Sequence, residues 1–154
     1  AFDHVPVRPA QALTTQWSPD TSADDRLILE VDGWCVYAEY ASVHPISLRI
    51  APRQRTTDLP SMTSGDRTTL ATILVRMFGA LDALFDAPLP YMMWINQAPR
   101  TTKDWPQAWF NIEIVSPWRA PHVPRYIAGV EIASGEYFNP VDPANVAARL
   151  RTLV

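Results

Sequence analysis

The stretch AWFNIEIVSPW, residues 108–118, shows the regular alternation that decides the fold of this chain. Phe110 and the two isoleucines fall on one side of the pattern, and the residues between them fall on the other. Successive side chains of a strand point to opposite faces of a sheet, so the alternation predicts a half-buried β-strand. Asn111 and Glu113 then lie side by side on the second face, between apolar neighbours. A polar pair in that position makes the stretch a candidate site.

A long helix is predicted upstream of this strand. Between Leu70 and Phe85, apolar residues recur at spacings of three and four over about four turns, which is the period of an amphipathic helix. Thr63 or Ser64 can cap its start, and the segment DAPLP at 86–90 stops it.

The remaining segments complete an α+β plan. Asp32-Gly33 between two apolar runs is a strong hairpin signal. Strands that follow one another without intervening helices indicate an antiparallel sheet. We expect about five or six strands with the long helix packed across one face and a short C-terminal helix. Residues 1–25 are predicted to be an extended proline-rich arm or linker, and 26–154 a single domain. The predicted strands are 26–31, 34–40, 46–50, 91–97, 108–115 and 126–133, and the short helix lies in 142–154.

Composition excludes several classes of protein. The 154 residues are 47% hydrophobic and 19% charged, as is usual for a globular domain. The net charge of −3 and the absence of a basic stripe argue against nucleic-acid binding. No apolar run reaches the roughly 20 residues of a membrane span, and no signal-peptide pattern is visible, so a cytoplasmic protein is expected. The lone Cys35 excludes an internal disulfide, and its apolar context predicts a buried thiol.

The region 91–125 is rich in aromatic and basic residues. Large aromatic side chains at this density can form a core, a cleft wall or an interface, and a core is the favoured interpretation. The basic residues of SPWRAPHVPR could bind a phosphate or form a solvated loop. The residues concerned are Trp94, Trp105, Trp109 and Trp118, followed by Arg119, His122 and Arg125.

Several motifs in a fixed order resemble the C-terminal half of the galactose-1-phosphate uridylyltransferase family. They are LFDAPLPYMMWINQAP at 84–99, WPQAWFNIEIVSPWRAPHVPRYIAGVEIASGEYFNP at 105–140 and NVAARLR at 145–151. The resemblance extends over about 26–154 and implies a domain of the histidine-triad type. Members of that family are built from two similar domains, and the N-terminal one carries a His-Pro-His motif whose histidine accepts the uridylyl group. This chain has no His-Pro-His, and His44-Pro45 is the nearest pair. The resemblance therefore implies a chain without the nucleophile.

The resemblance also identifies the polar pair of the opening stretch. Family members place metal-binding histidines at positions that match Asn96, Asn111 and Glu113. With all three replaced, no zinc or iron site of the family's type and no other cofactor is expected. Oxygen ligands at these positions would suit Mg²⁺ or Ca²⁺, and a hydrogen-bonded cluster without metal is the favoured alternative.

Substrate contacts follow from the resemblance at a second place. The family segment that matches RYIAGVEIASGEY reaches a partner's active site and contacts the sugar and phosphate of a nucleotide sugar. The matching residues are Arg125 and Glu131, with the third contact falling at about Tyr137 or Asn139.

Three functions are compatible with these residues. The first is the C-terminal half of a hexose-1-phosphate uridylyltransferase-like nucleotidyltransferase, a subunit or fragment that completes the fold and the sugar-phosphate pocket. It would be inactive without a His-Pro-His partner half, and a homo- or heterodimer is expected. The second is a free-standing module that binds a nucleotide sugar or hexose phosphate without catalysis. The third is a repurposed enzyme in which Glu113 or Glu131 acts as acid or base.

Overall fold

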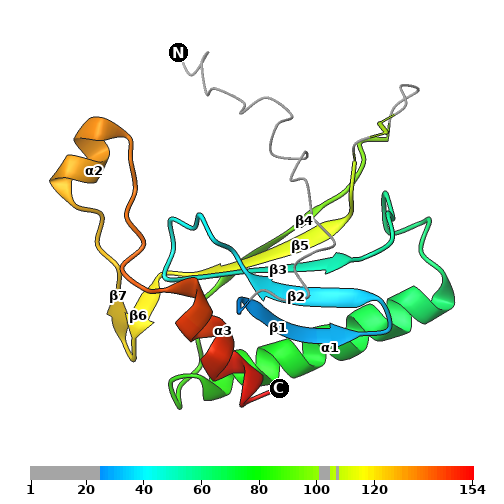
Figure 1. Cartoon of the computed structure of the whole chain (residues 1–154), viewed down its shortest axis with the longest axis horizontal. Coiled ribbons are helices and arrows are strands. Elements are labelled where there is room, and N and C mark those ends of the chain that lie inside the picture. The colour runs from blue at the N-terminus through cyan, green and yellow to red at the C-terminus, as the bar shows by residue number, and fades with distance from the viewer. Residues whose placement is uncertain (1–24, 101–104, 107) are drawn as a thin grey trace.

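A computed structural model describes residues 25–100, 105–106 and 108–154 of the chain (Figure 1). The arm expected at 1–25 therefore lies outside the described residues, except for its last position. In the described part, the strands are β1 Leu27–Val31, β2 Trp34–Ala38, β3 Ile46–Pro52, β4 Met92–Asn96, β5 Asn111–Ser116, β6 Trp118–Ala120 and β7 Val123–Pro124. The helices of the same residues are α1 Ser64–Ala83, α2 Gly129–Ser134 and α3 Pro143–Arg151.

Five of these strands form one antiparallel sheet in the order β1-β2-β3-β5-β4. The hairpin between β1 and β2 turns at Asp32 and Gly33, whose φ angles of 45° and 78° are both positive, as an Asp-Gly hairpin turn requires. The predicted antiparallel α+β architecture is confirmed. β4 lies at one edge of the sheet, next to β5.

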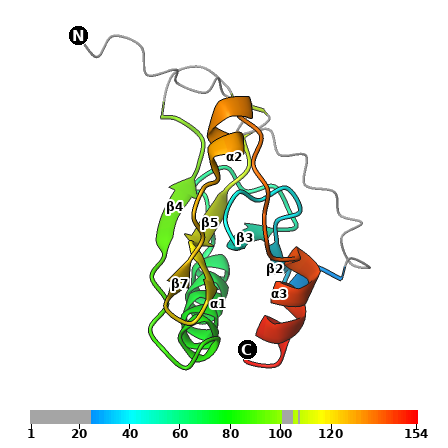
Figure 2. The same cartoon turned by 90° about the vertical axis from the view of Figure 1, so that its left-hand side faces the viewer.

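Helix α1 covers one face of the sheet, and the hydrophobic core lies between them (Figures 1 and 2). The helix begins with a capping box, in which the Thr63 hydroxyl accepts from Asp66 N–H and the Asp66 carboxylate accepts from Thr63 N–H. It contributes Leu70, Ile73, Met77 and Leu81 to the core, with the spacing that the sequence predicts.

The opening stretch behaves as the alternation predicts. Phe110, Ile112 and Ile114 are buried in the core, while Asn111 and Glu113 occupy the opposite face of β5. Helix α3 adds Val146, Ala147 and Leu150 to the same core, with Asp142 as its N-cap and Pro143 at its first position.

The prediction of a strand at 126–133 is wrong. The segment instead contains the short helix α2, which with its flanking residues forms a lobe that stands away from the five-stranded sheet (Figure 1). We call residues 125–140 the α2 lobe. Glu131 at the third helical position accepts from Ala128 N–H and caps the helix start, and Gly135 ends it at φ 72°. These capping interactions outweigh the β-branched residues of the segment, whose apolar side chains are mostly exposed.

A hairpin of β6 and β7, which the sequence did not predict, leads into the lobe. Its turn is Pro121-His122, with His122 at φ 59° and its ring packed against Trp118 at a centroid distance of 4.9 Å. Proline followed by a residue of positive φ is the signature of a type II turn, and glycine or asparagine is the usual second residue. The sequence predicts a proline-rich turn here, and the structure adds the two short strands that flank it.

The tryptophan region does not form the core. Trp94 is exposed at the sheet edge, and Trp105 and Trp109 are only partly buried. Trp118 is also partly buried, but it packs against the margin of the core beside Phe85. The tryptophan of the core is Trp34, whose ring packs edge-on against Phe110 at 6.0 Å. Cys35 is buried as predicted. None of the described helices is long and apolar enough to cross a membrane.

Candidate functional site

The three positions that the sequence singled out on β4 and β5 lie together. The side-chain amide of Asn96 donates to Asn111 Oδ1 at 2.8 Å and to Glu113 Oε1 at 2.7 Å. Asn111 in turn donates to the carbonyl oxygen of Trp109 at 3.0 Å. The backbone register places Asn96 opposite Asn111 and Trp94 opposite Glu113. The pairing of β4 with β5 therefore builds a connected polar group on the face away from α1.

An arginine closes this group on its other side. Arg49 on β3 lies opposite Glu113, and its guanidinium is 3.1 Å from Glu113 Oε1 and 2.5 Å from Glu39 Oε1. Ser47 donates to the second oxygen of Glu39 at 2.7 Å. We call Glu39, Ser47, Arg49, Asn96, Asn111 and Glu113 the polar cluster. Sequence reasoning missed Arg49 and Glu39, although a lone arginine within the apolar run ISLRI is the same signal as the lone acid of β5.

The polar cluster does not fit the zinc or iron that the family resemblance implies. The three candidate ligands supply one carboxylate and two amides, and the softer nitrogen donors that zinc prefers are absent from this described group. The described residues contain no group of three histidine, cysteine or acidic side chains that could hold a metal ion. In addition, the Glu113 oxygen nearest the amides already faces a guanidinium, whose positive charge repels a metal cation.

Burial shifts two pKa values around Arg49. Desolvation raises the pKa of Glu113, and the neighbouring Arg49 charge opposes that shift. Desolvation also raises the pKa of Tyr37 to about 12, again against the charge of Arg49. Tyr37 lies opposite Arg49 on β2, so tyrosine, arginine, glutamate and Trp94 form one row across four strands.

A second group of predicted residues lies in the α2 lobe. Arg125 and Glu131 form an ion pair whose side chains are 6% and 5% exposed. Arg125 also donates to the carbonyl oxygen of Phe138 at 2.9 Å, and Glu131 accepts from the N–H groups of Phe138 and Ala128 at 2.7 Å each. These backbone hydrogen bonds lower the pKa of Glu131. The pair holds the two ends of the lobe together.

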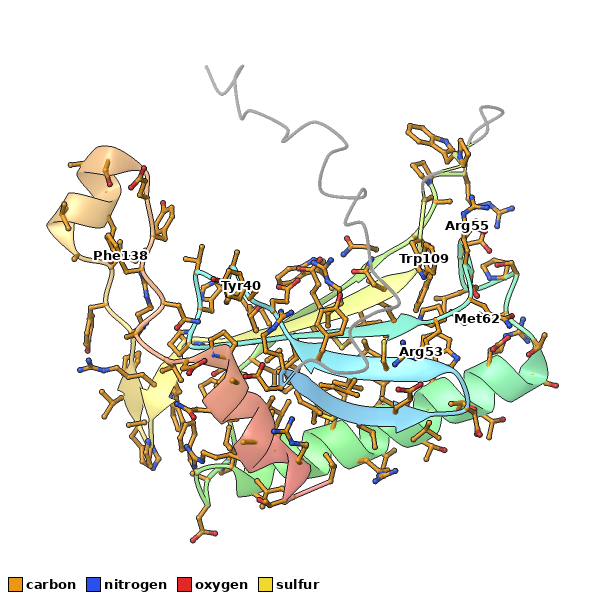
Figure 3. The ribbon with its side chains drawn as sticks, viewed as in Figure 1. Tyr40, Arg53, Arg55, Met62, Trp109 and Phe138 are labelled. Carbon is orange, nitrogen blue, oxygen red and sulfur yellow. The ribbon has the colours of Figure 1, made fainter. Side chains whose placement is uncertain are left out.

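A pocket of about 350 Å³ opens beside this ion pair. Figure 3 places Phe138 in the lobe, at the opposite end of the molecule from Trp109. Arg119 of the β6–β7 hairpin also faces the pocket and was part of the basic loop in the sequence, whereas His122 does not line it. The lining residues are Arg119, Arg125, Tyr126, Ala128, Glu131, Phe138 and Pro140.

The two other predicted contact residues lie outside this lining. Asn139 donates to the carbonyl oxygen of His44 at 3.0 Å and accepts from Val141 N–H, so its side chain ties the lobe to the loop before β3. Tyr137 is exposed. Burial, followed by the charge of Arg125, lowers the pKa of His44, so both effects favour the neutral imidazole.

The fold is similar to that of solved uridylyltransferase and histidine triad family structures. A solved uridylyltransferase structure superposes with a TM-score of 0.74 at 21% identity, and the match covers 92% of this chain and 43% of that one. An ADP-glucose phosphorylase from Arabidopsis thaliana, solved with bound ADP-glucose, gives a TM-score of 0.70 at 22% identity, covering 88% and 42% of the two chains.

Sequence comparison assigns the family. The family model described as galactose-1-phosphate uridyl transferase, C-terminal domain, matches residues 8–153, and the chain belongs to this family. A galactose-1-phosphate uridylyltransferase of Thermotoga maritima is 26% identical over 133 residues, which are 86% of this chain and 42% of that protein. The chain thus spans less than half the length of this relative.

Proposed function

We propose that this chain is the C-terminal half of a hexose-1-phosphate uridylyltransferase-like nucleotidyltransferase, acting in the cytoplasm. It completes the fold and the sugar-phosphate pocket, and a partner half carrying His-Pro-His supplies the nucleophile. The observation that supports this most is the family match over 8–153 in a sequence without His-Pro-His. Histidine attack on phosphorus needs that imidazole, so the chain alone is expected to be inactive.

The outer edge of β4 is the surface that we assign to the partner half. Within the described residues, β4 pairs with β5 on one side and with no strand on the other. Met92, Met93, Trp94 and Ile95 are each 41–54% exposed, so both faces of the strand carry uncovered apolar side chains. Long apolar edge strands are templates for pairing with another chain. The partner half would extend the sheet here.

Co-expression tests this assignment. A relative's N-terminal half that contains His-Pro-His is to be produced together with this chain and assayed for uridylyl exchange between a UDP-hexose and a hexose 1-phosphate. A stable complex with activity that neither half shows alone is expected. A lack of both complex and activity would remove the proposal.

A charge on β4 is expected to prevent the assembly. Met93→Lys places an ammonium group in the proposed apolar interface, where burial without a partner costs several kcal/mol. We expect the complex to weaken at least about tenfold, which corresponds to 1.4 kcal/mol, in sedimentation or co-elution experiments. Val75→Lys, at an exposed apolar position of α1, is the matched control and should leave the complex intact. Equal effects of both variants would contradict the assignment of β4.

The pocket of the α2 lobe is where we place the sugar phosphate. Arg119 and Arg125 give it positive charge, and Tyr126 and Phe138 give it aromatic walls. Arginine binds phosphate oxygens through paired N–H donors, and aromatic rings pack against sugar rings. The predicted contacts Arg125 and Glu131 would act together with Arg119, while Tyr137 and Asn139 would contribute from the rim of the lobe.

Loss of Arg119 is expected to weaken ligand binding. Arg125 is already paired with Glu131, so Arg119 is the cation more available to a phosphate group. Arg119→Ala should raise the Kd of the assembled protein for a hexose 1-phosphate by about tenfold in calorimetry, the loss of roughly one charge-assisted hydrogen bond. Arg76→Ala on the exposed face of α1 is the control. An unchanged Kd in Arg119→Ala would move the ligand away from this pocket.

The same calorimetry separates the other two functions. Tight binding of UDP-hexose by this chain alone, with no gain on adding the partner half, would favour a free-standing binding module. Acid–base catalysis by Glu113 or Glu131 remains a prediction, although Arg49 and Arg125 pair with these carboxylates and favour their charged forms. An activity that survives Glu113→Gln and Glu131→Gln would exclude it.

A further inference from the structure

We propose that the polar cluster is a cation site whose resident cation is the guanidinium of Arg49, and that the wild-type chain binds no metal there. The proposal concerns the structural centre of the sheet and does not depend on the transferase function. It rests on the arrangement of charges and donors around Arg49.

The charges of the polar cluster converge on one guanidinium nitrogen. Arg49 Nη2 is 2.5 Å from Glu39 and 3.1 Å from Glu113, so two carboxylates share one positive group. The side chain of Arg49 is 9% exposed, and those of Glu113 and Glu39 are 14% and 20% exposed, so the carboxylates are largely but not fully buried. Two largely buried carboxylates without a nearby cation are unfavourable, and here Arg49 supplies that cation.

The remaining members of the cluster orient these carboxylates. Ser47 donates to Glu39, and Asn96 donates to both Asn111 and Glu113. Each carboxylate thus receives a neutral hydrogen bond in addition to the guanidinium. In metal sites, hydrogen bonds from neighbouring residues hold the metal ligands in place. Here the same kind of hydrogen bond holds the carboxylates that face the guanidinium.

The position of Arg49 allows its guanidinium to link neighbouring strands of the sheet. Glu39 directly follows β2, Arg49 lies on β3, Glu113 on β5 and Asn96 on β4, so the cluster connects four neighbouring strands of the sheet. A bound metal ion would connect the same strands through its ligands. The guanidinium does so without requiring metal supply, and its charge excludes a second cation from the Glu113 oxygen.

Metal content of the wild-type protein is the first test. The protein is to be produced in medium supplemented with zinc, iron and manganese and analysed by plasma mass spectrometry. We expect far less than one metal ion per chain and the same melting temperature with and without EDTA. A stoichiometric metal whose removal lowers the melting temperature would overturn the proposal.

Removal of the guanidinium is the second test. Arg49→Met leaves Glu39 and Glu113 without the cation that they share, and carboxylate oxygens are the ligands that suit Mn²⁺ or Ca²⁺. We expect a melting temperature lowered by roughly 10 °C, since breaking a buried ion pair is strongly destabilising. Added Mn²⁺ should recover a large part of that loss in Arg49→Met and leave the wild type unchanged.

Two control variants make the second test specific. Arg53→Met breaks the more exposed ion pair with Glu30 and should change the melting temperature little, with no response to Mn²⁺. Arg49→Lys keeps a positive charge, so it should be more stable than Arg49→Met and equally unresponsive to Mn²⁺. If Mn²⁺ and Ca²⁺ both fail to stabilise Arg49→Met, folded or not, the position is not a cation site and the proposal is wrong.

Discussion

Replacing Phe110 by alanine is expected to lower the free energy of unfolding by about 3–5 kcal/mol. The Phe110 ring is fully buried and packs edge-on against Trp34, at the junction of the sheet and helix α1. Its removal leaves a cavity that neighbouring strands cannot fill, because β5 is held by β3 on one side and by β4 on the other. Urea titration followed by tryptophan fluorescence measures the change.

The same substitution at Phe138 provides the control for this prediction. Phe138 is exposed in the α2 lobe, so Phe138→Ala should change the free energy of unfolding by less than about 0.5 kcal/mol. A loss below about 1 kcal/mol for Phe110→Ala would mean that the core described here is not the core that stabilises the domain.

Glu131→Gln is expected to abolish the protection of the α2 lobe against amide hydrogen exchange while leaving the sheet protected. The substitution removes the charge that Arg125 neutralises, and it replaces one acceptor oxygen by a donor among the N–H groups of Ala128 and Phe138. The lobe has few other links to the domain, so it should open as a unit. Exchange of peptides from 126–140, read by mass spectrometry, measures the effect.

Acidification should open the lobe in the wild type by the same route. The pKa of Glu131 in the folded chain lies below its ordinary value of 4.5, chiefly because the N–H groups of Phe138 and Ala128 favour the carboxylate. Its contribution to stability is therefore complete above about pH 4.5 and is lost as the pH falls through the folded pKa. Glu131→Gln should lack this dependence, and Glu136→Gln, at an exposed position nearby, should keep it. A lobe that stays protected in Glu131→Gln would contradict this account of the ion pair.

The core of the fold could be predicted because local patterns and packing agree. The alternation around Phe110, the Asp32-Gly33 turn and the period of α1 each predict the element that the structure contains. In these segments, burial of one apolar face decides the structure. Such burial requires apolar residues at regular spacings, which can be recognised in the sequence.

The parts that were missed depend on interactions between distant residues. The segment around Glu131 has the composition of a strand, but a carboxylate that caps its own helix and pairs with Arg125 decides its conformation. Likewise, Asn111 and Glu113 could be identified as a site from alternation, whereas Arg49 and Glu39 join them only through the register of β2, β3 and β5. The order of strands in a sheet cannot be predicted from any single stretch of sequence.

The exposed apolar side chains of the edge strand β4 are also expected to affect how the cell handles the protein. Uncovered methionine, tryptophan and isoleucine side chains beside an unpaired backbone edge of the described sheet are features that chaperones and proteases recognise in orphan subunits. Under the proposed function, a copy whose β4 edge is not covered by a partner half would be a substrate for cellular quality control.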